Sequence, residues 1–146
     1  MDLVKAKEKE NTYWYFSERG VVRMVTYSGK LFWVTFFIAF FLFWLFVGIG
    51  GAVGGVITGG IISIVFEYAV SSPKVKRWDN LSLKELENEQ GSKSLAWTSI
   101  KNATFTARER LEVTVNDQRH KMKVLTDVDA TQKLLKHHLG SKFSAT

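Results

Sequence analysis

The chain has no cysteine, only three histidines, and almost no charge in its middle. The absence of cysteine excludes a disulfide framework and a thiolate metal site. The histidines, His120, His137 and His138, lack a zinc-type spacing with a third ligand, so no metal site is expected. No nucleophile–base–acid arrangement and no phosphate-cradling glycine loop stands out. We therefore expect no catalytic residue and no cofactor, and we expect that the protein is not an enzyme.

The uncharged middle of the chain is also uniformly apolar. Between Leu31 and Val70, Glu67 is the only formally charged residue, and seven of the 11 Phe lie between Phe32 and Phe46. A soluble core helix shows a polar face, which this run lacks. As one helix, the run would measure about 60 Å, roughly twice the hydrocarbon thickness of a bilayer. It must therefore cross the bilayer twice.

A cluster of glycines near the middle of the run marks the reversal. We expect a transmembrane helical hairpin over residues 30–70, with helices at about 30–47 and 51–70. Basic residues flank the run on both sides, and such residues stay on the cytoplasmic side. The sequence thus predicts a multi-pass protein of the cell (inner) membrane with both termini cytoplasmic. The glycines are Gly48, Gly50, Gly51, Gly54 and Gly55; the flanking basic residues are Lys5, Lys7, Lys9, Arg19, Arg23 and Lys30 before the run, and Lys74, Lys76 and Arg77 after it.

The net charge of +6 and the pI of about 9.6 would suggest nucleic acid as a partner of a soluble protein. Membrane topology explains the same excess of basic residues, because many of them flank the apolar run. We expect the lipid bilayer as a partner and no nucleic acid.

Small residues recur at every fourth position of the second helix. Such a glycine zipper lets two backbones approach closely, and lipid supplies no hydrophobic drive to bring helices together otherwise. In one interpretation, Phe side chains of the first helix fill this groove within one chain. In the other, the groove contacts a second copy or a membrane-protein partner. The stripe is Gly51, Gly55, Gly59 and Ser63, with the parallel pair Gly50 and Gly54 beside it.

Glu67 is the one candidate for an intramembrane polar site, because carboxylates inside a membrane are costly and often functional. It lies about one turn from the cytoplasmic end of the second helix, where a side chain can reach the headgroups. Tyr68 beside it is typical of the membrane interface. This position favours an interfacial role over a proton relay.

The segment before the membrane, residues 1–29, predicts a β-hairpin whose turn is Ser17–Gly20. After the membrane, residues 71–140 predict a cytosolic β-meander and a C-terminal helix, followed by a tail at 141–146. Ser82 and Glu85 have capping-box spacing and open a short helix. A loop at 90–94 separates this short helix from the strands.

Three strands and one amphipathic helix are expected in the C-terminal half. For the last two strands, pairing Val115 with His120 puts apolar residues on one face and sets Glu112 against Lys123, which predicts a turn at Asn116–Arg119. The strands are 102–107, 110–115 and 119–125; the helix is about 127–139, with Thr126 as its N-cap, Gly140 at its end, and Leu135, Leu139, Val128 and Gln132 on its sheet-facing side.

Basic residues of these strands are the candidates for contact with lipid headgroups or a partner. Anionic headgroups attract such residues at about 1 kcal/mol each near a membrane surface. The alternative is an ordinary solvated strand face, on which Lys123 pairs with Glu112. The candidates are Arg119, Lys121, Lys101, Arg108 and Arg110.

Two segments carry a family resemblance. Residues 96–105, Ala-Trp-Thr-Ser-Ile-Lys-Asn-Ala-Thr-Phe, resemble the aromatic-polar-x-Ile entry into a strand of pleckstrin-homology-like (PH-like) domains. Residues 15–22, Tyr-Phe-Ser-Glu-Arg-Gly-Val-Val, are similar to the first hairpin turn of bacterial members. The resemblance implies a PH-like half-barrel or barrel that is interrupted by the membrane hairpin and whose two parts unite in the cytoplasm. The sequence offers five strand candidates where the family has seven.

The expected fold class is therefore an α+β membrane protein, a two-helix transmembrane hairpin inserted in a small antiparallel β-domain with a C-terminal helix. We hypothesise a non-enzymatic membrane-anchored scaffold or accessory subunit. Its glycine-lined helix would contact a membrane-protein partner or form a homo-oligomer, and its β-domain would contact lipid headgroups or a cytosolic partner. The alternative is an oligomeric pore or transporter component, with Glu67 near the cytoplasmic mouth.

Overall fold

The structure is a computed structural model that describes residues 3–9, 11–26, 29–47, 52–106 and 109–145. The chain forms two compact units, and its fold class is α+β, as predicted. We call Met1–Val25 together with Leu81–Thr146 the β unit, and Thr26–Asn80 the helical unit.

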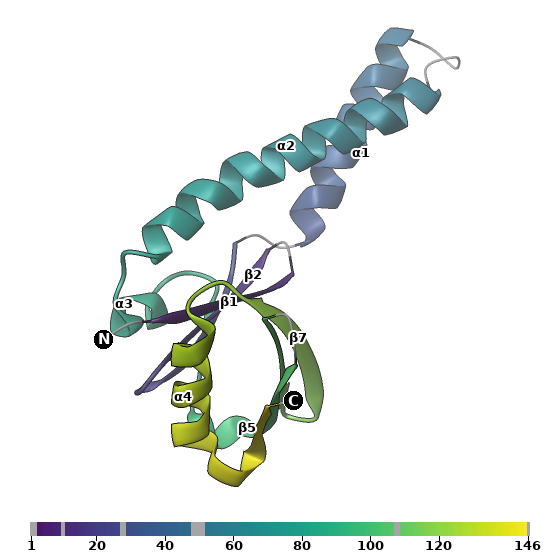
Figure 1. Ribbon diagram of the computed structural model, residues 1–146. Coiled ribbons are helices and arrows are strands. Elements are labelled where there is room, and N and C mark those ends of the chain that lie inside the picture. The colour runs from purple at the N-terminus through teal and green to yellow at the C-terminus, as the bar shows by residue number, and fades with distance from the viewer. Residues whose placement is uncertain (1–2, 10, 27–28, 48–51, 107–108, 146) are drawn as a thin grey trace. The chain divides into compact units, whose positions relative to one another are not determined.

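The β unit is built on one eight-stranded sheet that curls into a half-barrel (Figure 1). Its strand order is β4-β3-β2-β1-β7-β6-β5-β8. Neighbouring strands are antiparallel except β5 and β8, which are parallel. The strands are β1 (Val4–Lys9), β2 (Thr12–Ser17), β3 (Gly20–Val25), β4 (Ser92–Leu95), β5 (Ile100–Thr106), β6 (Arg110–Val115), β7 (Gln118–Val124) and β8 (Phe143–Ala145).

Strands from both sides of the helical unit share this sheet. The predicted hairpin is present, since β2 pairs with β3 and Ser17 lies opposite Gly20. The N-terminal strands join the C-terminal ones at two seams, β1 with β7 and β3 with β4. The helical unit is therefore an insertion into the connection between two neighbouring strands, β3 and β4.

The predicted register of β6 and β7 is wrong by two residues. Val115 lies opposite Gln118, and Val113 opposite His120, so the turn contains only Asn116 and Asp117. Both turn residues have positive φ, 48° and 64°, as a type I′ turn requires. A shift of two residues leaves every side chain on its face, so facial agreement could not distinguish the registers. The turn chemistry distinguishes them, because Asn and Asp tolerate this conformation.

The sequence also predicted too few strands, five against the eight of the structure. β1 was missed because its lysines were attributed to membrane topology, although Val4 and Ala6 alternate with Lys5 and Lys7 as a strand requires. β4 lies where a loop was predicted. β8 has only three residues and no alternation to recognise.

The helices of the β unit begin with side-chain caps. In α3 (Leu83–Glu87), Glu85 accepts a hydrogen bond from the backbone N–H of Ser82 at 2.8 Å, so the predicted capping box is present. The N-cap of α4 (Val128–Leu139) is Asp127 rather than Thr126. The Thr126 hydroxyl instead accepts from the backbone N–H of Lys5 at 3.2 Å, which ties this turn to β1.

The core of the β unit fills the curl of the sheet. Leu135 and Leu139, on the predicted face of α4, are buried in it. Short 3₁₀ turns, η2 (Trp97–Ser99) and η3 (Gly140–Lys142), lead into β5 and β8. The fully buried large side chains of this core include Trp14, Phe16, Ile100, Leu111 and Val113.

The helical unit consists of α1 (Gly29–Val47) and α2 (Ala52–Trp78), which lie side by side as an antiparallel pair (Figure 1). α2 runs past Val70, where we predicted its end, and contains Pro73. The end of the apolar run marks a change in polarity, not in backbone conformation. The Lys74 ammonium donates to the backbone oxygen of Thr26 at 2.9 Å, which ties the polar part of α2 to the residues before α1.

Candidate functional site

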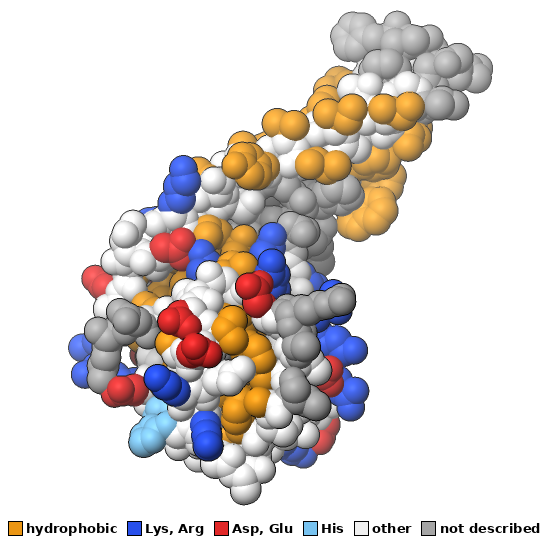
Figure 2. Space-filling model, viewed as in Figure 1, with side chains coloured by type: hydrophobic (Ala, Val, Ile, Leu, Met, Phe, Trp, Pro, Cys, Tyr) orange, Lys and Arg blue, Asp and Glu red, His pale blue; other side chains and the backbone are white. Residues whose placement is uncertain are grey.

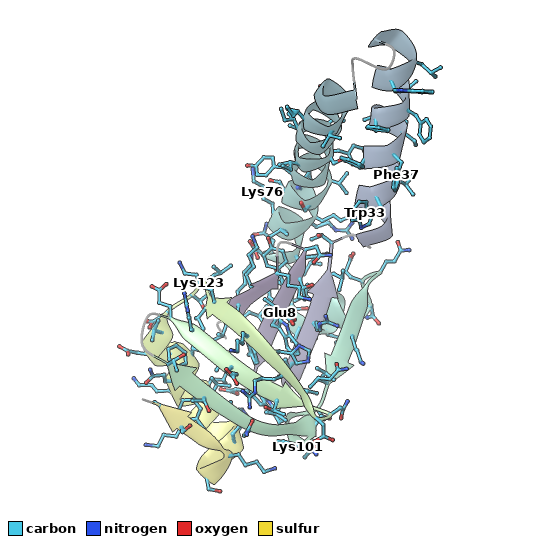
Figure 3. The ribbon with its side chains drawn as sticks, turned by 90° about the vertical axis from the view of Figure 1, so that its right-hand side faces the viewer. Glu8, Trp33, Phe37, Lys76, Lys101 and Lys123 are labelled. Carbon is cyan, nitrogen blue, oxygen red and sulfur yellow. The ribbon has the colours of Figure 1, made fainter. Side chains whose placement is uncertain are left out.

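The first candidate site is the outer surface of the helical unit. Of the 17 large hydrophobic side chains that are exposed among the described residues, 16 belong to α1 and α2, and Leu125 is the exception. On α1, Trp33 is 56% exposed and Phe37 52% (Figure 3). On α2, Ile57 and Ile61 are 59% and 57% exposed. Figure 2 shows these apolar side chains over the visible face of the helices, whereas charged side chains gather on the β unit.

The helices of this unit differ in whether their apolar part is long enough to cross a membrane. Within the described residues, one helical stretch, Gly54–Trp78, is long and apolar enough to cross a bilayer by length and composition. The apolar described stretch of α1, Trp33–Leu42, is shorter. A core helix of a soluble protein can be as long and as apolar, but it is mostly buried. Here only 18% of the apolar window is buried.

The small-residue stripe of α2 faces α1. Gly55, Gly59 and Ser63 are buried, and Gly54 is partly buried. A Cβ placed on Gly59 would lie 3.4 Å from both the ring and the backbone oxygen of Phe36. This contact favours the first of the two interpretations, in which a Phe of the first helix fills the groove within one chain.

The structure does not describe several of the predicted site residues. Gly50 and Gly51 lie outside the described residues, as does Arg108. Glu67 lies within α2, but its side chain is not described. The proton-relay and pore hypotheses for Glu67 therefore stay predictions from the sequence.

The predicted basic residues of the β unit do not form one cluster. Lys101 contacts the Asp117 carboxylate, and Arg119 contacts Glu112 at 2.8 Å. Arg110 and Lys121, in contrast, line a cavity of about 420 Å³ on the sheet. Figure 3 shows Lys101 and Lys123 at opposite ends of the sheet.

The predicted pair of Glu112 and Lys123 is wrong. Because the register differs, Glu112 lies opposite Lys121 and contacts it at 3.8 Å, while its other oxygen contacts Arg119. Lys123 contacts Glu109 at 3.4 Å instead.

A polar cluster inside the half-barrel was missed by the sequence analysis. One oxygen of Glu8 lies 2.9 Å from His120 Nδ1, and the other accepts from Trp14 Nε1 at 2.9 Å. Arg23 Nε lies 3.6 Å from the same carboxylate, and its guanidinium lies over the Trp14 ring at 5.8 Å. The Glu8 side chain is only 9% exposed (Figure 3). The cluster thus joins β1, β2, β3 and β7 through one buried carboxylate.

The electrostatics of this cluster favour ionised Glu8. Burial alone would raise the pKa of the Glu8 carboxyl, but the hydrogen bonds from His120 and Trp14, together with the charges of His120 and Arg23, outweigh it. The pKa of Glu8 is therefore lowered from its ordinary value. Each Glu8 oxygen already has a partner, so this arrangement serves the fold, and no predicted site residue belongs to it.

An aromatic pair, Trp97 and His138, joins η2 to α4. The rings of Trp97 and His138 stack at 4.6 Å and 5°, and Trp97 Nε1 donates to the backbone oxygen of Ser17 at 3.0 Å. His138 Nε2 is buried and has no hydrogen-bond partner among the described residues. Desolvation and the neighbouring His137 lower the pKa of His138 against a smaller opposing effect of Glu18.

Among the described residues, no group of three or more His, Asp or Glu side chains is placed to hold a metal ion. The comparisons with known proteins add no further guide. No protein-family model, curated protein or solved structure matches this chain.

Proposed function

We propose that this chain is a non-enzymatic membrane-anchored scaffold or accessory subunit of the cell (inner) membrane. Its helical unit spans the bilayer as a two-helix hairpin, and both termini lie in the cytoplasm. The observation that carries the proposal is the concentration of exposed apolar side chains on one unit of the chain. In water this surface would be an aggregation liability, whereas lipid removes its cost.

The dimensions of the helices support this reading. α2 has 27 residues and is thus about 40 Å long, which exceeds the roughly 30 Å of a hydrocarbon core. Its C-terminal turns carry Lys74, Lys76 and Arg77, which suit the headgroup region on the cytoplasmic side. The chain enters and leaves the hairpin from the β unit, so we place the β unit on the cytoplasmic side as well.

The packing of the hairpin defines which surface could meet a partner. Because Phe36 lies against Gly59, the small-residue stripe serves the hairpin itself. The remaining exposed face of α2 is aliphatic, with Val56, Ile57 and Ile61 among its residues. We propose that this face meets lipid, another copy or a membrane-protein partner.

We propose that the β unit acts as a PH-like domain, in line with the resemblance of its sequence. Support comes from strands on both sides of the insertion sharing one curled sheet, with an amphipathic helix packed in its core. A domain of this kind on the cytoplasmic surface would hold lipid headgroups or a cytosolic protein.

The test uses single cysteines, since the natural chain has none. We expect Gly50→Cys, between the two helices, to react with a membrane-impermeant maleimide added to intact cells. Lys101→Cys, on the exposed surface of β5, should react only after the cells are lysed. Labelling of Lys101→Cys in intact cells, or release of the chain by alkaline carbonate, would contradict the proposal.

A further inference from the structure

The sheet of the β unit has two edges, β4 and β8, and the β4 edge is protected. The backbone N–H of Ser92 donates to the Glu89 oxygen at 3.1 Å, and the Ser94 hydroxyl donates to the Glu87 carboxylate at 3.0 Å. Lys93 between them is exposed. Polar contacts and lysines of this kind keep an edge from adding a further strand.

The β8 edge has less protection. β8 pairs with β5 alone, in parallel. The Phe143 N–H donates to the Gly140 oxygen at the end of η3, and in the described part of the chain no other turn or loop bonds to the backbone of β8. A strand presents backbone donors and acceptors on both sides, so those on the outer side of β8 are available to another strand.

A groove of about 490 Å³ lies between β8 and α4, and we call it the α4–β8 groove. Figure 1 shows these two elements close together near the C-terminus. On β8, Phe143 and Ala145 line the groove, and their partners on β5, Ala103 and Phe105, are buried. The groove therefore borders the open side of β8 and does not extend over β5. On α4 it is lined by one helix face, with i, i+3, i+4 and i+7 spacing, which consists of Asp129, Gln132, Lys133 and Lys136.

The groove combines apolar and basic side chains. Phe143 is half-buried and packs against the core, and Ala145 is exposed. Lys133 and Lys136 are exposed, and neither has an acidic partner within the described ranges. Two lysines against Asp129 leave an excess of +1, which favours an acidic ligand. The volume is within the usual range of ligand pockets.

We propose that the α4–β8 groove binds an extended acidic segment of a cytosolic protein, which adds to the sheet as a strand beside β8. The inference deepens the proposed function and rests on it, because it needs the β unit in the cytoplasm. Backbone hydrogen bonds to β8 would hold the segment extended, and Lys133 and Lys136 would contact its carboxylates. Because β8 has only three residues, the side chains of the groove must supply much of the affinity.

A second copy of the chain is a poor occupant of this groove. The edge strand that another copy could offer, β4, has the sequence Ser-Lys-Ser-Leu and carries no acidic residue. The chain has a net charge of +6, so a basic groove disfavours a second copy. Charge complementarity thus favours a different protein.

The first experiment measures binding of the fluorescein-labelled peptide Glu-Val-Glu-Val-Glu-Val-Glu to the full chain in an uncharged detergent, by fluorescence anisotropy at low salt. We expect saturable binding that Lys133→Gln/Lys136→Gln weakens by about fivefold or more. The control, Lys84→Gln/Lys93→Gln, loses the same charge from exposed positions outside the groove and should stay within about twofold. Circular dichroism checks that both variants fold.

A second experiment distinguishes strand addition from attraction between charges. Two further peptides carry backbone N-methyl groups, one on its valines and the other on its glutamates. An added strand pairs with β8 through one of its edges, and alternate residues point to opposite edges. One methylated peptide should therefore lose about tenfold or more in affinity, and the other should lose much less. Equal affinities of the two methylated peptides would contradict strand addition.

A third experiment blocks the groove and tests for a second copy in it. Ala145→Trp places a large side chain in the groove and should weaken binding by about tenfold or more. Ser144→Trp is the control, because Ser144 lies on the other face of β8, where its hydroxyl contacts Thr104 at 3.2 Å. Light scattering gives the mass of each protein. A natural dimer that Ala145→Trp dissociates would make the groove a contact between copies and overturn the proposal.

The inference is also overturned if the natural chain shows no saturable binding, or if the groove variants and their controls bind equally. These measurements use detergent, so they do not depend on the orientation of the chain in a membrane. A membrane-embedded chain without selective binding refutes the peptide groove alone. Selective binding by a chain whose Lys101→Cys variant is labelled in intact cells refutes the cytoplasmic location alone.

Discussion

Gly59 of α2 lies against Phe36 of α1, so closely that a Cβ on Gly59 would touch both the ring and the backbone oxygen at 3.4 Å. The neighbouring residue, Gly60, has no atom within 4 Å of the same position. Two adjacent glycines of one helix thus have opposite environments. The absence of a side chain at Gly59 thus allows α2 to approach the backbone of α1 at Phe36, as small residues do between closely packed helices.

Gly59→Leu should therefore separate the two helices. Three further carbon atoms beyond Cβ cannot fit between Gly59 and Phe36, and such overpacking costs about 1–3 kcal/mol. The thermal unfolding midpoints of the natural chain and of the variant in detergent, followed by tryptophan fluorescence, would measure the loss of packing.

Gly60→Leu is the matched control, because its side chain would enter open space. It should keep the unfolding midpoint of the natural chain. Equal losses in both variants would show that the contact between Gly59 and Phe36 does not determine the packing of the two helices.

The two-residue turn between β6 and β7 supports a second prediction. Asn116 has a φ of 48°, which β-branched residues adopt only with strain. Asn116→Val should destabilise the β unit by about 1–3 kcal/mol, and Asn116→Gly should leave its stability unchanged or raise it. Thermal unfolding of the full chain in detergent, followed by tryptophan fluorescence, measures both effects. If the four-residue turn predicted from the sequence were right, valine would be tolerated.

This turn also shows what the sequence could decide. Strand alternation predicted β6 from Arg110 to Val115 without error and placed β7 within a residue. Alternation has a period of two, so it could not resolve a shift of two residues. The Asn-Asp pair carried the missing information in its tolerance of positive φ.

The candidate sites were less predictable than the strands. Arg110 and Lys121 were named as contacts, but Lys123, which lines the same cavity, was assigned to Glu112 because of the wrong register. Lys7 was attributed to topology, because β1 was not recognised. The cluster of Glu8 and His120 joins residues 112 positions apart, and only the closure of the sheet brings them together.

The buried Glu8 carboxylate supports a third prediction, on acid stability. Because its pKa is lowered in the folded state, the unfolded chain binds more protons as the pH falls. The stabilisation by Glu8 is fully present above the ordinary glutamate pKa of about 4.3, and it is lost as the pH falls through the lower folded value. Glu8→Gln should flatten this part of the profile and lower the stability at neutral pH by about 1–3 kcal/mol.

Unfolding midpoints between about pH 3 and pH 7 test this prediction. Glu87→Gln, which changes an exposed carboxylate of α3, is the control and should follow the natural profile. A Glu8→Gln profile parallel to the natural one would show that the cluster does not carry the acid sensitivity.

His138 supports the last prediction, in a higher pH range. Its ring stacks on Trp97 and its Nε2 is buried without a partner among the described residues, so the neutral form fits this position best. Because its pKa is lowered on folding, protonation favours the unfolded chain. Stability should therefore fall as the pH decreases through the ordinary histidine pKa of about 6.5.

His138→Phe keeps a flat ring on Trp97 but cannot take up a proton, so it should remove this step from the pH profile of unfolding. His137→Phe removes only the neighbouring charge that contributes to the lowered pKa of His138. It should shift the step toward higher pH and make it smaller without abolishing it. A step that survives in His138→Phe would place the titrating group elsewhere, since the stack would then be intact without a proton to gain.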